Sequence, residues 1–132
     1  MYRQLLAVIA FCAFLNAPAK AGQDDELSIG LFSTGIWYAC SDQKVAENIA
    51  LTFVTRGGDA AIGLFHQNAL LCDLTPGPAK LYVETVVWQR EMQRGGDLMK
   101  VVLMSEWKDG KPDKTLYVLT LRPVNESVIA GM

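Results

Sequence analysis

The side chains best suited to nucleophilic chemistry are Cys40 and the single histidine, His66. A cysteine just ahead of a helix can act as a nucleophile, with His66 as its base and Asp73 orienting the ring. The residues around Cys40, "YACSD", match no cysteine-peptidase signature, and Cys72 offers a disulfide partner instead. We therefore expect His66 to be a partly exposed residue near a helix end and not a catalytic base.

Carboxylate pairs are the second source of possible chemistry, since the chain has 14 acidic residues. Glu84 and Glu106 are the pair to inspect, because each lies among apolar neighbours in an expected strand, where burial raises a carboxyl pKa. A charge that protects a sheet edge from aggregation explains both more simply. The acidic run 24–26 lacks the ligand spacing and glycine of a calcium loop, and a disulfide removes both thiols from any zinc site. No metal or cofactor is expected.

Aromatic side chains are the most prominent remaining feature. Tryptophan and tyrosine are enriched at binding hot spots, although a small sheet also needs bulky residues for its core. Alternation places Tyr82 and Trp88 on one face of an expected strand, and Trp107 on the next strand can join them. These three form the candidate binding face, drawn from a wider set at expected strands or strand ends: Trp37, Tyr38, Tyr82, Trp88, Trp107 and Tyr117.

The first 21 residues have the layout of a cleaved secretory signal peptide. Arg3 precedes an unbroken apolar run from Leu5 to Leu15, and the small-residue pattern Ala19-Lys20-Ala21 follows. The run is well short of the roughly 20 residues that a membrane-spanning helix needs. We expect cleavage after Ala21 and export to the periplasm or the extracellular space.

Export determines the expected state of the cysteines and the charge. Cys12 leaves with the signal peptide, so Cys40 and Cys72 remain as a pair in an oxidising compartment and are expected to form a disulfide. Loss of Arg3 and Lys20 lowers the basic count from 12 to 10 against 14 acidic residues, a net charge of −4. Nucleic acid is therefore not an expected partner. The expected partner is another protein or an envelope component. The oligomeric state is left open.

The first half of the expected domain is helical. Residues 22–28 read as a mobile acidic leader. Apolar residues then recur at helical spacing over residues 42–56, which begin at a capping Asp42 and stop at Gly57. Asp59 is expected to cap a second, shorter helix.

The second half is expected to form strands over residues 80–92, 97–108 and 114–122, joined by hairpin turns. The sequence "RGGD" occurs in both halves, first as a helix stop at residues 56–59 and then as a hairpin turn at residues 94–97. We read this as shared turn chemistry and not as a repeat.

These elements predict a single α+β domain over residues 22–132, with one or two helices on a three- to four-stranded antiparallel meander. Large apolar side chains on both strand faces predict a sheet that curls into a partial barrel or faces a partner. The favoured function is an exported, disulfide-stapled binding module, such as an inhibitor, an adaptor or an envelope-complex component. The alternative is a small secreted hydrolase that uses His66 or a carboxylate pair. An enzyme should gather these groups in a pocket, whereas a binder should expose an aromatic patch.

Overall fold

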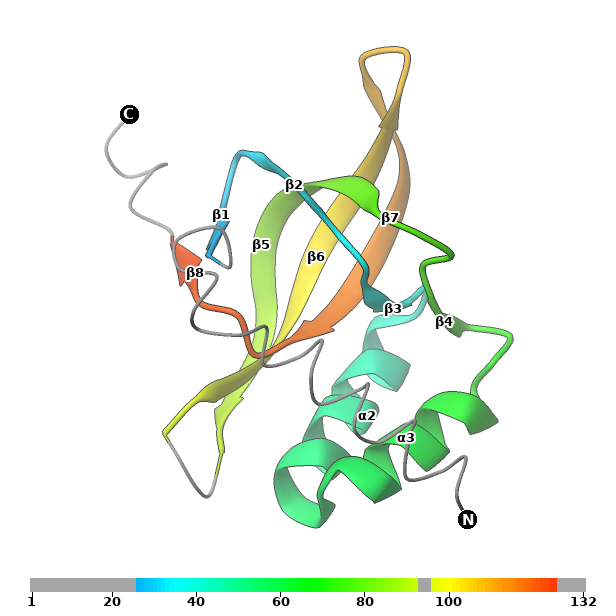
Figure 1. Ribbon diagram of the computed structural model, residues 1–132, viewed down its shortest axis with the longest axis vertical. Coiled ribbons are helices and arrows are strands. Elements are labelled where there is room, and N and C mark those ends of the chain that lie inside the picture. The colour runs from blue at the N-terminus through cyan, green and yellow to red at the C-terminus, as the bar shows by residue number, and fades with distance from the viewer. Residues whose placement is uncertain (1–25, 93–95, 126–132) are drawn as a thin grey trace.

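A computed structural model describes residues 26–92 and 96–125 (Figure 1). The expected signal peptide and leader residues 22–25 lie outside these ranges, as do Arg94 and Gly95 of the second "RGGD". The elements in chain order are β1 (Leu27–Ser28), β2 (Phe32–Gly35), β3 (Tyr38–Cys40), α2 (Gln43–Arg56), α3 (Gly58–Gln67), β4 (Cys72–Leu74), β5 (Ala79–Glu91), β6 (Leu98–Lys108), β7 (Lys111–Thr120) and β8 (Val124–Asn125).

The expected α+β fold with a partial barrel is confirmed. The long strands β5, β6 and β7 form the antiparallel meander, and three short strands extend it to a six-stranded sheet in the order β2-β5-β6-β7-β3-β4. The sheet curls into a half-barrel (Figure 1). A two-residue turn joins β6 to β7, with Asp109 at φ 55° and Gly110 at φ 75°. Positive φ at both central positions matches the right-handed twist of the two strands.

The two helices follow the expected signals with one difference. The Asp42 side chain caps α2 by accepting a hydrogen bond from the Val45 N–H at 3.0 Å, and Gly57 ends the helix at φ 92°. The α3 helix begins at Gly58, with Gly57 as its N-cap residue and no side-chain cap. The expectation that Asp59 caps α3 is therefore wrong, because Gly57 serves both helices and places Asp59 inside the first turn. There its charge still suits the positive end of the helix dipole.

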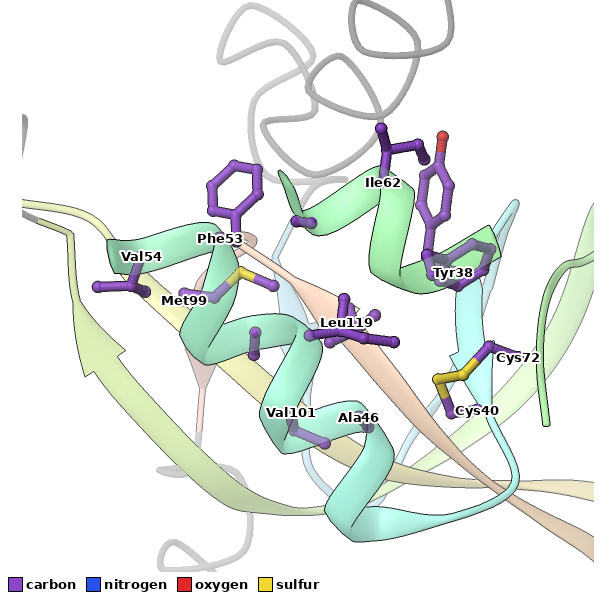
Figure 2. Packing of buried hydrophobic residues seen from close by; sticks show 14 of the residues in the cluster. Tyr38, Cys40, Ala46, Phe53, Val54, Ile62, Cys72, Met99, Val101 and Leu119 are labelled. Carbon is purple, nitrogen blue, oxygen red and sulfur yellow. A yellow bond between two sulfur atoms is a disulfide. The ribbon is translucent and has the colours of Figure 1, made fainter. Parts of the chain in front are cut away.

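The outer face of the sheet forms one hydrophobic core with the helices (Figure 2). Ala46, Ile49 and Phe53 of α2 pack against Val101 of β6 and Leu119 of β7 within this cluster. Burial of the apolar stripe of α2, and not the intrinsic helix propensity of its residues, is what holds a 14-residue helix in place.

The inner, concave face of the half-barrel holds a second core, which includes Leu81, Val83, Val102, Met104 and Val118. Residues on alternate positions of the same strands thus enter different cores, which explains why both strand faces are apolar.

Trp37 is the central residue of the inner core. The chain passes from β2 at one sheet edge to β3 near the other, and Trp37 lies between them with 3% of its surface exposed. Its indole Nε1–H donates to the Ala79 carbonyl at 2.9 Å, and its backbone N–H donates to Thr75 Oγ1 at 2.9 Å. Gly35 allows this close packing, since a Cβ there would lie 3.2 Å from the Trp37 ring.

The ordered domain begins earlier than the sequence predicts. Leu27 was expected in a mobile leader, but it belongs to β1, which pairs in parallel with β8. Its side chain is fully buried in the inner core because the β1–β8 pair covers part of the concave face. The acidic residues that precede Leu27 led us to expect a mobile leader, so the burial of Leu27 was not predicted from the sequence.

Candidate functional site

Three aromatic side chains form a cluster on the outer face, in which Tyr82 is half-buried and the other two are exposed. We call it the outer aromatic patch: Phe32 of β2, Tyr82 of β5 and Trp107 of β6. The ring centroids lie 5.2 Å apart for Phe32–Tyr82, 5.4 Å for Phe32–Trp107 and 5.2 Å for Tyr82–Trp107. Phe32 is 42% exposed and Trp107 is 37% exposed, so large ring areas face solvent although the rings also contact one another. Trp107 is the second-last residue of β6, and the hairpin that follows it lies at the end of the sheet away from the helices (Figure 1).

Long-range strand pairing positions the rings. Phe32 lies directly opposite Tyr82 in the β2–β5 pair, and Tyr82 lies opposite Ser105 in the β5–β6 pair. Residues directly opposite each other in an antiparallel pair share a face, so these side chains point the same way. Trp107 follows two residues after Ser105 on that face.

A hydrogen-bonded chain holds Trp107 in place. The indole Nε1–H donates to Ser105 Oγ at 2.9 Å, and the Ser105 hydroxyl donates to Glu84 Oε2 at 2.7 Å. Ser105 is fully buried, so both of its bonds lie beneath the patch. Glu84 is the extra residue of a β-bulge between Val83 and Thr85, and a bulge re-aims a side chain in this way.

A positive charge borders the patch on the edge strand side. The Lys80 ammonium lies 5.0 Å from the centroid of the Phe32 ring, a cation–π distance. Together with Glu84, which holds Ser105 beneath the patch, Lys80 gives the apolar rings charged neighbours of both signs. That composition is typical of the centre and rim of a protein interface.

Of the three residues predicted for the binding face, the structure brings together Tyr82 and Trp107 but not Trp88. Trp88 does share the outer face, because the bulges at Glu84 and Val87 cancel and pair it with Val101. It lies farther along β5, however, and packs against the helical core, with the Arg90 guanidinium 6.0 Å from its ring. Strand alternation predicts the face of the sheet on which a side chain lies. It does not predict which residues of neighbouring strands lie beside that side chain.

The predicted Cys40–Cys72 disulfide is present (Figure 2). The two residues lie directly opposite each other in the β3–β4 pair, with Cα atoms 3.9 Å apart and a sequence separation of 32. The bridge removes Cys40 as a nucleophile. His66 is exposed on α3, and Asp73 accepts a hydrogen bond from its neighbour Leu74 at 2.8 Å.

The expected carboxylate pair does not converge. Glu84 lies on the outer face with Ser105, whereas Glu106, the next residue on β6, points to the other face opposite Lys114. Glu106 instead lines a cavity of about 410 Å³ beside β4, together with Asp73. Both of these acids are exposed to solvent.

Within residues 26–92 and 96–125, no cluster of three or more histidine, cysteine or acidic side chains is placed to hold a metal ion. In the same part of the chain, neither helix combines the length and apolar character needed to cross a membrane.

Comparison with protein-family models, curated proteins and solved structures gives no match to this chain.

Proposed function

We propose that the protein is an exported, non-catalytic binding module, and that the outer aromatic patch docks onto a partner protein. The observation that supports this is the partly exposed contact cluster of Phe32, Tyr82 and Trp107. Interface hot spots are rich in aromatic residues that are surrounded by a polar rim.

The arrangement of the rings favours a protein surface over a sugar or a cationic ligand. Centroid separations of 5.2–5.4 Å mean that the rings fill the space between them, so no cage is left for an ammonium group. Phe32 meets the other two rings at 66° and 79°, so the three rings form a compact apolar cluster and not a flat platform for stacking. A cluster of this kind suits an apolar surface on a partner protein.

Rigidity of the patch strengthens the proposal. The Trp107–Ser105–Glu84 chain fixes the indole before binding, so little side-chain entropy remains to be lost in a complex. The disulfide supports the export part of the proposal, because such bonds persist in oxidising compartments.

The hydrolase alternative has one structural observation in its favour, the shared cavity of Glu106 and Asp73. Cys40 is bonded to Cys72 and is therefore no nucleophile for His66 to activate. Glu84 and Glu106 lie on opposite faces of the sheet. If the protein were a carboxylate hydrolase, Glu106→Gln would abolish cleavage of a generic ester or glycoside substrate. We expect no cleavage by the wild-type protein.

Site-specific photocrosslinking in the cells that make the protein tests the binding proposal. We would replace Phe32 by p-benzoylphenylalanine, which keeps an aromatic ring in the patch. The control is the same replacement at Leu70, which is fully exposed in the turn after α3. We expect one discrete protein adduct from position 32 and none from position 70. Equal adducts from both positions, or none from position 32, would contradict the proposal.

A further inference from the structure

A cavity at the opposite end of the half-barrel contains a buried lysine that the proposed function does not use. The cavity has a volume of about 380 Å³ and is lined by residues of β5, β6 and β8 and by the chain just before β6 and after β7. The Lys100 side chain in its wall is only 6% exposed. A volume of this size is at the lower end of the range for small-molecule sites, which often lie at the mouths of β-barrels.

Two polar side chains from adjacent strands, Lys100 of β6 and Gln89 of β5, line the cavity. Lys100 of β6 lies opposite Gln89 of β5 and Thr120 of β7, so the three side chains share the concave face. The next layer inward consists of Val86, Val102 and Val118. A polar row at the mouth therefore meets an apolar interior.

The buried position of Lys100 is unfavourable for the stability of the folded protein. Burial lowers the pKa of its ammonium group, and the Asp97 carboxylate opposes that shift. The Nζ atom donates to the Leu98 carbonyl at 2.8 Å, which accounts for one of its three N–H donors. Proteins tolerate buried charges of this kind mainly where they are paired or functional.

We propose that this cavity binds a small carboxylate with an apolar body, and that Lys100 pairs with the carboxylate. An anion beside the ammonium offsets the cost of removing it from water, and a charge-assisted hydrogen bond to a carboxylate is stronger than one to a neutral carbonyl. Gln89 supplies a further polar group in the cavity wall. The apolar body contacts Val86, Leu98 and Val124 in the cavity wall.

Asp97 sets the orientation of the bound carboxylate. It is exposed at the rim of the cavity, where its own charge is hydrated, and it repels an anion from the rim. The carboxylate therefore enters toward Lys100 and away from Asp97. This site lies at the Leu98 end of β6, whereas Trp107 lies near the other end, so the inference is independent of the proposed function.

Octanoate and its neutral counterpart octanamide are suitable probes, since they differ only in the head group. Amide chemical shifts of the full mature protein would be followed by NMR during titration with each. We expect octanoate to shift the amides of Gly96, Leu98 and Lys100 in a saturable manner, and to bind about tenfold more tightly than octanamide. Equal affinities for the two probes, or shifts confined to the outer aromatic patch, would overturn the proposal.

Lys100→Met tests the role of the charge, and Lys44→Met is the matched control because Lys44 is an exposed lysine on α2. We expect Lys100→Met to remove the tenfold preference for octanoate and Lys44→Met to retain it. Retention of the preference by Lys100→Met would refute the pairing. The titration of the wild-type protein does not depend on the folding of either variant.

Discussion

Removal of the Cys40–Cys72 disulfide should destabilise the protein by an amount that the structure allows us to calculate. The bridge closes a loop with a sequence separation of 32 residues, which contains α2 and α3. In the chain-entropy model a loop of this size stabilises the folded state by about 3.7 kcal/mol at 25 °C. That is a large share of the roughly 5–15 kcal/mol that holds a small domain together.

The bridge also joins the edge strand β4 to β3, so its removal should loosen this edge of the sheet. The edge strand β4 has only three residues, and it joins the sheet through β3. Without the bridge, the segment that returns from α3 to the sheet is held by a few backbone hydrogen bonds, such as the Ser41 N–H to the Leu71 carbonyl at 2.7 Å. Both cysteines are buried, so replacement by alanine also removes packing contacts.

Urea unfolding followed by tryptophan fluorescence is the appropriate assay, with the Cys40→Ala/Cys72→Ala variant compared with the oxidised protein. With a slope of about 1.5–2 kcal/mol/M, the midpoint should fall by about 2 M urea. The wild-type protein under reducing conditions is the control that isolates the cross-link from the lost packing. A loss below about 0.5 kcal/mol in both samples would refute the assigned role of the bridge.

Three further predictions concern single residues. Trp37→Phe should cost about 2–3 kcal/mol in unfolding free energy, because it leaves the Ala79 carbonyl without its indole donor and opens space in the inner core; an unchanged urea midpoint would contradict this. Lys100→Met should raise the melting temperature at pH 7, since the lowered pKa of Lys100 means that the charged form destabilises the folded state. The advantage should shrink as the pH rises toward about 10.4, the pKa of an unfolded lysine, and a constant advantage between pH 7 and pH 11 would refute it. Gly110→Ala should lower the free energy of unfolding by about 1 kcal/mol, because φ is 75° at this position and strains any residue with a Cβ. Thermal unfolding measures the loss. The control is Gly63→Ala, which should cause no loss because φ is not positive there and space is open.

Local signals in the sequence were sufficient to predict the helices and the hairpins. Helical spacing and Asp42 gave the start of α2, and Gly57 gave its end, because caps and periodicity act within a few residues. The disulfide followed from a count of cysteines in a chain that we expect to be exported. Apolar residues on both strand faces predicted the partial barrel.

The parts that the sequence did not predict depend on contacts between distant segments. Leu27 is buried because β1 pairs with β8 almost 100 residues later, and its acidic neighbours carried no sign of this. Phe32 joins Tyr82 through pairing across 50 residues, so the aromatic patch was predicted without one of its rings. The bulges at Glu84 and Val87 follow from no local pattern that we recognise.

Lys100 was not predicted as a site residue from the sequence. In the run "LMKVVLM" it alternates with Val102 and Met104, which places its side chain on the concave face.

The affinity of the crosslinked partner for variants of the outer aromatic patch tests the central claim most directly. With the partner purified, Trp107→Ala should weaken binding by about 30-fold, which corresponds to a hot spot of about 2 kcal/mol. Leu70→Ala, which removes an exposed side chain elsewhere, should leave the affinity unchanged, and both variants should keep a folded circular dichroism spectrum. Equal affinities of the wild-type protein and the Trp107→Ala variant would contradict the claim that this patch is the binding surface.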